Sequence, residues 1–449
     1  MIQQNGKPAL RRDLGLIQAT ALAITDMIGI GPFITIPLFL STMGGPQAMV
    51  GWLLGALLAF CDGLVWCELG AAMPKAGGSY HYLREAYGRG NFGRWFSFLF
   101  VWQIIFSAPL SVASGSIGFA NYCRFLVPQI TPWGARLLAS SIPLILIGLL
   151  YRGIRQLGKL SVILLVGVLA GCFWIVVAGL PHLNLTRLLD FSPDTFRMNW
   201  IFWAGLGHAT LYALYDYFGY YNVCYLGEEI RRPEKVIPRA ILFSIALVAA
   251  LYILMSSSIL SVIPWRQARE STYIASAYIE KLQGSGAAHV MTVLMLWIAF
   301  SSIFSLLLGY SRIPYAAASD GNFFRVFARL HPSGDFPHVS LVTLGLIASV
   351  FSLGKLPDVI GSLVATRVLI QYLPQAVGLF VLRRRAPELK RPFRMWLYPV
   401  PGLISILGWL YILGTAAARS LVFASVVFLV GSLIFFARAR IRREWPFAK

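Results

Sequence analysis

Apolar residues fill twelve long stretches of the chain, and shorter polar connections separate them. A helix needs about 20 mostly apolar residues to cross the roughly 30 Å hydrocarbon core of a membrane. The stretches cover residues 14–40, 46–72, 95–122, 136–150, 159–180, 199–226, 239–263, 289–311, 338–354, 358–382, 398–416 and 420–437. This pattern predicts an all-α integral membrane protein with twelve transmembrane helices.

The polar connections are too short to hold a soluble domain. The longest are 73–94, 181–198, 264–288, 312–337 and 383–397. One of them, 264–288, contains the sequence STYIASAYIEKLQG, in which apolar residues recur at helical spacing. We expect a short amphipathic helix there that caps one face of the protein. The chain is therefore predicted to be a single membrane domain over residues 1–449.

Composition excludes the common soluble classes. Hydrophobic residues make up 57% of the chain and charged residues 12%, whereas soluble proteins carry about 25% charged residues. Intrinsic disorder needs low hydrophobicity. The net charge of +20 would suggest nucleic-acid binding in a soluble protein, but in a membrane protein it suggests basic cytoplasmic loops.

The distribution of Lys and Arg predicts the orientation in the membrane. With both termini in the cytoplasm, the cytoplasmic segments carry 28 of the 38 Lys and Arg residues, and the outer segments carry 9. The remaining one, Arg367, falls inside a span. Cytoplasmic loops of membrane proteins are enriched in Lys and Arg. We therefore expect cytoplasmic N- and C-termini, in a multi-pass protein of the cell membrane.

Two of the predicted spans are interrupted by glycine. Span 1 contains DMIGIGPF at residues 26–33, and span 6 contains LYALYDYFGYY at residues 211–221. Glycine lowers helix stability and proline removes a backbone donor. Broken helices at corresponding positions in two halves of a chain mark the substrate site of many transporters. Close helix packing is the alternative explanation for these glycines.

Three sequence segments resemble the amino acid–polyamine–organocation transporter superfamily. They are IGIGPF at 28–33, CELGAAMPKAGGSYHYLREAYG at 67–88 and GYYNVCYLGEEIRRPEKVIPRAI at 219–241. A fourth and weaker match is YSRIPYAAASDG at 310–321. The second and third segments are specific, and together the matches run through most of the first ten spans.

The resemblance implies a single transporter domain with the LeuT-like fold. Its first five-helix repeat would cover 14–180, the second and inverted repeat 199–382, and two further helices 398–437. The substrate would bind between the broken helices 1 and 6. The residues expected to bind it are Gly29, Ile30, Gly31, Tyr215, Asp216 and Gly219.

Helix physics supports the same site independently. A broken helix leaves free N–H groups at its new N-terminus and free C=O groups at its new C-terminus. The donor end favours a carboxylate and the acceptor end favours a cation. A zwitterionic amino acid carries both charges, so two crossing broken helices can hold both of its ends.

Two residues depart from the usual amino acid pattern of the superfamily. Pro32 has no N–H, so one carboxylate donor is missing, and Asp216 adds a carboxylate where many relatives carry a small neutral residue. Both changes favour a cationic amine. The break sequence and LLYRGI at 149–154 are similar to polyamine-uptake members. We therefore expect a secondary active transporter of amino acids or polyamines, tilted toward cationic amines; a neutral amino acid permease or exchanger is the alternative.

Four further ionisable residues are candidates for gating or coupling: Asp26, Asp62, His208 and Arg367. Arg367 is expected to pair with a carboxylate inside the bundle, although it could instead receive an acidic substrate. A hydrogen-bonded buried histidine is the alternative for His208. Glu68 is expected to be a structural partner of a cytoplasmic Arg or Lys.

The coupling ion, proton or sodium, is not determined by the sequence. Ser301 and Ser302 could offer oxygens to sodium, but such serines usually bond to their own helix backbone. The aromatic residues Trp203, Tyr215, Tyr217 and Tyr220 could stack on the substrate or serve helix packing. The five cysteines and six histidines form no metal-binding pattern, so we expect no cofactor and no metal.

Other functional classes fit less well. A membrane enzyme would need a metal cluster or a nucleophile–base pair, and a channel would normally contain a filter motif; neither is evident in the sequence. A substrate sensor built on a transporter fold would usually carry a signalling domain. The expected partners are a small-molecule substrate and the lipid bilayer, with no nucleic acid and no obligatory protein partner.

Overall fold

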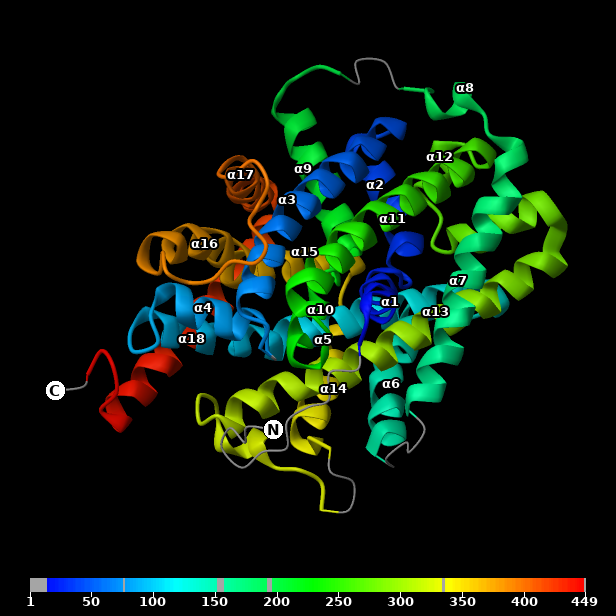
Figure 1. Cartoon of the computed structure of the whole chain (residues 1–449). Helices are drawn as coiled ribbons and strands as arrows, with labels where there is room; N and C mark the ends of the chain where they lie inside the picture. The colour runs from blue at the N-terminus through cyan, green and yellow to red at the C-terminus, as the bar shows by residue number, and fades with distance from the viewer. Residues whose placement is uncertain (1–13, 76, 152–156, 192–195, 333–335, 448–449) are drawn as a thin grey trace.

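A computed structural model describes residues 14–75, 77–151, 157–191, 196–332 and 336–447 (Figure 1). The described residues form helices joined by loops, and none of them forms a β-strand; Leu14 and Ile230 make one isolated bridge. The predicted all-α class is therefore confirmed.

The helices follow the predicted apolar stretches along the chain. The first ones are α1 (Leu16–Met27), α2 (Gly31–Met43), α3 (Val50–Ala72), α4 (Ser79–Tyr87), α5 (Phe92–Leu126), α6 (Pro132–Tyr151), α7 (Leu157–Gly179), α8 (Leu185–Leu188) and α9 (Trp200–Tyr217). The later ones are α10 (Asn222–Tyr225), α11 (Pro233–Val262), α12 (Trp265–Ala268), α13 (Ile274–Ser319), α14 (His338–Phe351), α15 (Leu356–Arg367), α16 (Leu373–Arg385), α17 (Val400–Thr415) and α18 (Ala418–Arg442). A π-helical turn, Val368–Tyr372, joins α15 to α16.

Many of these helices are long enough to cross a membrane. Among the described residues, seven helices have the length and apolar composition of a span, and the bent pair α1 and α2 makes an eighth. Three shorter apolar helices cover Val166–His182, His338–Phe351 and Val400–Thr415. The protein is thus a multi-span membrane protein, while the total of twelve crossings and the two inverted repeats stay predictions.

The bundle is organised around two long helices. Helix α5 packs against α13, α15, α14 and α6, and helix α3 packs against α11, α9 and α17. Small residues allow close approach between α3 and α9, because a Cβ on Gly55 would lie 2.6 Å from the Cβ of Ala213. The two broken spans lie between these groups, with α1 against α11 and α2 against α9.

The sequence predicts non-helical backbone near 29–32 in span 1, and the break covers 28–30, so Gly31 and Pro32 already belong to α2. Helix α1 ends at Met27, Ile28 is extended, and α2 begins at Gly31 after a bend of 48°. Pro32 lies in the first turn of α2. Proline is favoured there because the amide it lacks has no partner within the helix, and its fixed φ suits a helix start. The proline therefore helps to start the second half of the span.

The break in span 6 lies slightly later than predicted. We expected non-helical backbone near 215–219, but α9 continues through Tyr217, and the break covers 218–221. Phe218 is extended and Gly219 has φ +133°. A Cβ on Gly219 would lie 2.7–2.9 Å from the backbone of Asp26 and Met27. Glycine is thus required where the two breaks touch.

The amphipathic helix predicted in 264–288 is present. It forms the first part of α13, before a sharp turn at Gly284 with φ +84°. Ile274, Tyr278 and Ile279 are fully buried, while Glu280 and Lys281 are exposed. The apolar face is therefore buried on the bundle, as expected for a capping helix.

Candidate substrate-binding site

A cavity of about 280 Å³ lies where the breaks in spans 1 and 6 meet. Its walls come from the α1–α2 break and from α5, α9, α13 and α15. All six predicted binding residues line it: Gly29, Ile30, Gly31, Tyr215, Asp216 and Gly219. Pockets for drug-sized ligands measure about 300–1,000 Å³, so this cavity suits a small molecule.

Free backbone amides stand in the cavity wall at the start of α2. The amides of Gly29 and Ile30 have no hydrogen-bond partner among the described residues. Both precede a helix N-terminus, where the helix dipole favours negative charge. This end of the cavity is chemically suited to a carboxylate.

The carbonyl ends of the two broken helices are tied together by one hydroxyl group. The Tyr252 hydroxyl donates to the carbonyl oxygen of Met27 at 2.7 Å and lies 3.2 Å from that of Asp216. These two residues lie in the last turns of α1 and α9. Tyr252 therefore fixes the two helix ends against each other and partly satisfies their free carbonyl groups.

Asp216 lies in the cavity wall but is tightly enclosed. Its Oδ2 accepts a hydrogen bond of 2.6 Å from Thr35 Oγ1 on α2, and its Oδ1 has no partner and is buried. A Cβ on Gly31 would overlap Oδ1 and lie 3.2 Å from Cγ. The carboxyl group thus joins α9 to α2, with the missing side chain of Gly31 leaving room for it.

Arg367 has hydroxyl partners where we expected a carboxylate. Its Nη1 donates to the Tyr221 hydroxyl at 2.8 Å, and its Nη2 donates to the Tyr310 hydroxyl at 2.8 Å and to Ser111 Oγ at 3.4 Å. Its Nε has no partner. Within the described part of the chain, Arg367 forms no ion pair, so the expected internal ion pair is wrong.

Two more polar contacts hold the helices around the cavity. The Tyr215 hydroxyl lies 2.7 Å from Ser114 Oγ on α5. Asp26 Oδ2 accepts from Asn222 Nδ2 at 3.0 Å, which links α1 to α10 on the other side of both breaks. Asp26 lines the cavity, consistent with its place among the gating candidates, and its role stays a prediction.

Several candidate residues lie outside the cavity. Asp62 accepts hydrogen bonds from Trp66, Tyr220 and Trp409 at 2.6–3.1 Å. His208 is half-buried on α9 and does not line the cavity. The coupling roles proposed for both are untested, although the saturated carboxylate of Asp62 favours a structural role.

The aromatic candidates divide in the same way. Tyr215 lines the cavity, whereas Trp203 is 44% exposed and Tyr217 packs on Trp52 with ring centroids 5.9 Å apart. Tyr220 is fully buried against Asp62. Of the four, only Tyr215 is in a position to contact a ligand in this cavity.

Ser301 and Ser302 both line the cavity and both bond to their own helix. Their hydroxyls donate to the carbonyls of Trp297 and Ile298 at 2.6 and 3.0 Å. This is the bonding expected for serine in a membrane helix. The described part of the chain holds no group of three or more His, Cys, Asp or Glu that could bind a metal.

The cavity continues into a second one of about 360 Å³. Both are lined by Asp26, Asn222, Tyr310 and Arg312. The second cavity extends to Glu229, whose carbonyl accepts from the Leu14 amide just before α1. Together the two cavities therefore extend toward the end of the bundle where α1 begins.

Hydrogen bonds also join α2, α5 and α13 beyond Ile30, on another side of the first cavity. The Tyr122 hydroxyl of α5 lies 3.4 Å from the carbonyl of Phe33 and accepts from the amide of Ala275 at 3.3 Å. These contacts join α2 and the capping part of α13 to α5. Ile30 of the first break lies beside Gly118 of α5. A Cβ added to Gly118 would lie 3.3 Å from the Ile30 side chain.

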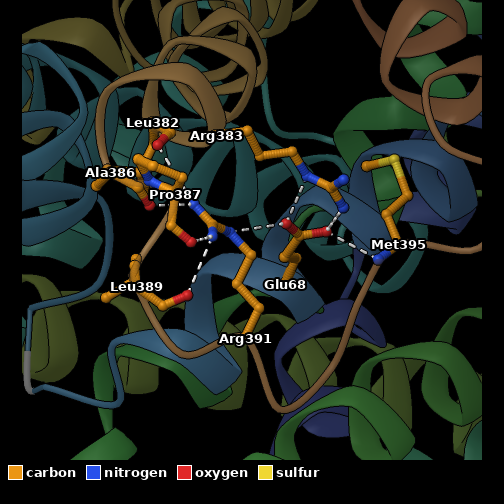
Figure 2. Close-up of polar contacts among 8 residues, drawn as sticks. All are labelled: Glu68, Leu382, Arg383, Ala386, Pro387, Leu389, Arg391 and Met395. Atoms are coloured by element: carbon orange, nitrogen blue, oxygen red, sulfur yellow. Dashed lines mark hydrogen bonds and ion pairs between the residues drawn. The ribbon is translucent and has the colours of Figure 1, made fainter.

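The expected partner of Glu68 is confirmed. Glu68 is buried on α3 and accepts two hydrogen bonds from Arg383, at 2.8 and 2.5 Å, and one from the Met395 amide at 2.8 Å. Arg391 Nε lies 3.5 Å from it. Figure 2 shows this cluster, which ties the connection after α16 to α3.

Sequence reasoning missed the residues that support the site from other helices, above all Thr35, Tyr252 and Tyr310. Their partners lie far away in the sequence, so periodicity could not identify them. One signal was available in α5, where Ser107, Ser111 and Ser114 are spaced by four and three residues. That spacing places them on one helix face, and in an apolar span it marks a polar face of the bundle.

Comparison with known proteins points in the same direction. A family profile described as amino acid permease matches residues 14–439. The serine/threonine exchanger SteT of Bacillus subtilis (strain 168) is 27% identical over 94% of this chain and 95% of its own length. Asc-type amino acid transporter 1 of Mus musculus is 29% identical, over 90% of this chain and 76% of its own. Cationic amino acid transporter 4 of the same species is 24% identical, over 84% and 60%.

Proposed function

Because this chain belongs to the amino acid permease family of the amino acid–polyamine–organocation superfamily, we propose that it is a secondary active transporter that moves amino acids across the cell membrane by alternating access. It is a membrane transporter and not an enzyme. The single observation that carries the proposal is the cavity enclosed by the two touching helix breaks.

The substrate is held by its two charged ends. Its carboxylate accepts from the unpaired amides of Gly29 and Ile30 at the start of α2, where the helix dipole favours negative charge. Its ammonium group lies toward the opposite helix ends, at the C-terminus of α9 beside Asp216. The volume of the cavity, about 280 Å³, is large enough for an amino acid.

Alternating access follows from the two broken spans. The cavity continues into the second one, toward the start of α1, while Tyr122 links α5 to α2 and α13 on another side. With both termini cytoplasmic, as the loop charges favour, this arrangement is the inward-facing state. Asp26 lies in both cavities and holds Asn222, so we keep it as a gating residue.

A cationic amine or polyamine is the second candidate substrate. The observation in its favour is Asp216, a carboxyl group in the cavity wall with one unpaired oxygen. Two observations speak against a cationic substrate. The unpaired oxygen of Asp216 is packed closely against Gly31, and the positive charge of Arg367 lies in the same cavity wall. A relative named for cationic amino acids supports this candidate only weakly, because it matches at 24% identity.

Counterflow tests the proposal. Purified protein in vesicles loaded with unlabelled serine should accumulate labelled serine, and the label should be displaced by other amino acids. A carrier exchanges its substrate across the vesicle membrane, whereas a sensor or an enzyme does not. The proposal fails if no amino acid, of neutral, basic or acidic type, supports exchange by folded protein.

Removing the charge of Asp216 separates the two substrate candidates. Asp216→Asn keeps the shape of the side chain and its bond to Thr35. If the substrate is cationic, its affinity should fall by about 1.5–3 kcal/mol, the range for hydrogen bonds to charged groups, with a much smaller change for neutral amino acids. Binding constants of lysine, putrescine and serine measure the difference. Equal changes for all three would make Asp216 a structural residue and remove the support for a polyamine.

A further inference from the structure

The guanidinium group of Arg367 is a buried positive charge without a negative partner. The side chain is 2% exposed and forms no ion pair within the described part of the chain. Its partners are three hydroxyl groups and the ring of Phe218, whose centroid lies 5.5 Å away. Neutral partners offset only part of the cost of burying a charge. The positive charge of Arg367 is therefore available to pair with an anion.

The free side of the guanidinium group faces the cavity. Nη1 points back to Tyr221, which does not line the cavity, whereas Nη2 points to Ser111 and Tyr310, which both line it. The bond to Ser111 is the longest of the three, at 3.4 Å, and Nε has no partner at all. A ligand carboxylate that displaces Ser111 can accept a charge-assisted hydrogen bond from Nη2.

The carboxyl groups of the protein itself do not fill this role. The two that line the same cavity, Asp26 and Asp216, are held by Asn222 and Thr35. The α-carboxylate of an amino acid has its own place at the amides of Gly29 and Ile30. A second carboxylate, on the substrate side chain, remains as the partner of Arg367.

We propose that Arg367 binds the side-chain carboxylate of an acidic amino acid, so that aspartate or glutamate is a substrate of this transporter. The inference rests on the proposed amino acid transport. It assigns a specificity role to a residue on α15, outside both helix breaks. The hydroxyl groups of Tyr221 and Tyr310 act as positioning groups that hold the guanidinium group at the cavity wall.

The sharpest test compares ligands of equal shape. Glutamate and glutamine differ at the side chain only in charge and hydrogen bonding, as do aspartate and asparagine. We expect the wild-type protein to bind the acid of each pair roughly 10- to 100-fold more tightly, which is the range for a charged hydrogen-bonded pair. Competition against labelled substrate in vesicles measures both constants. A preference for the amides would overturn the inference without a variant being made.

Substitution of Arg367 tests whether this residue causes the preference for the acid over the amide. Arg367→Gln should remove the preference for glutamate over glutamine and should weaken glutamate binding far more than serine binding. Arg419→Gln is the control, because Arg419 is 80% exposed, does not line the cavity and pairs with Asp358 at the start of α15 at 3.6 Å; it should change neither constant. Arg367→Lys keeps the positive charge but lacks the planar guanidinium group, so it should retain part of the preference for glutamate. This variant tests the inference if Arg367→Gln does not fold.

The outcomes distinguish this inference from the proposed function. Exchange of serine without binding of either acid overturns the role of Arg367 and leaves amino acid transport standing. An equal loss of serine and glutamate in Arg367→Gln, in folded protein, also overturns it, because the arginine then holds a group common to all amino acids. Exchange of no amino acid at all overturns the proposed function itself.

Discussion

Gly31→Leu is expected to abolish transport while the protein still folds and inserts. Gly31 begins α2, and a Cβ there would overlap Asp216 Oδ1 and lie 3.3 Å from the Tyr215 ring. Both neighbours line the cavity, and Asp216 is held by Thr35. A leucine must therefore displace the α9 end from the α2 start or fill the cavity. Either change removes the binding site, so uptake should fall to the background level.

Gly31→Ala should already cost most of the activity, because the overlap begins at Cβ. Gly148→Ala is the matched control: Gly148 lies in helix α6 and a Cβ there would meet no heavy atom within 4 Å. Alanine is the better helix former by roughly 1 kcal/mol, so this variant should transport normally and be no less stable. Uptake in vesicles and size-exclusion profiles measure the pair. Normal uptake by Gly31→Leu would mean that the first break has only a structural role.

The positions of the spans and the first break follow from local chemistry. Twenty apolar residues form a membrane helix wherever they occur, and Gly29, Gly31 and Pro32 interrupt a helix through their own backbone properties. For that reason the predicted stretches agree with the helices, and the α1–α2 break overlaps the predicted residues. The break in span 6 was predicted at 215–219, a few residues too early, because α9 stays helical through Tyr217 and the chain breaks at Phe218 and Gly219.

The partners of the buried polar groups could not be predicted in the same way. Arg367 was expected to meet a carboxylate, since that is the usual partner of a buried arginine. Its actual partners lie on α5, α13 and the break after α9. Each of these contacts depends on how helices far apart in sequence pack together. The partner of Glu68 was easier to predict, because the connection 383–397 contains several basic residues close to one end of the bundle.

Glu68→Gln should destabilise the protein more than any other single removal of a charge outside the cavity. The wild-type carboxylate is 1% exposed and pairs with both Arg383 and Arg391. Arg391 in turn donates to the carbonyls of Leu382, Ala386, Pro387 and Leu389 at 2.9–3.3 Å (Figure 2). Removing one member of a buried ion pair costs about 3–5 kcal/mol, because the other charge stays buried without compensation.

The matched control is Glu444→Gln, which removes a carboxylate from another arginine pair. Glu444 accepts from Arg94 Nη2 at 2.6 Å, but both side chains are about one quarter to one third exposed. Ion pairs of this kind contribute about 0–1 kcal/mol. The apparent melting temperature in detergent should therefore fall by several degrees in Glu68→Gln and by little in Glu444→Gln.

A double variant shows whether Glu68→Gln destabilises the protein by leaving a buried positive charge unpaired or by disturbing the packing around it. Glu68→Gln combined with Arg383→Met removes one buried positive charge along with the negative one. Because replacing both members of a buried pair by groups of similar size is often nearly neutral, the double variant should recover part of the stability. Neither residue lines the substrate cavity, so folded protein of each variant should keep the substrate affinity of the wild type. A double variant less stable than Glu68→Gln would mean that Arg383 stabilises the connection through its packing on the Tyr398 ring, 3.7 Å away, rather than through its charge.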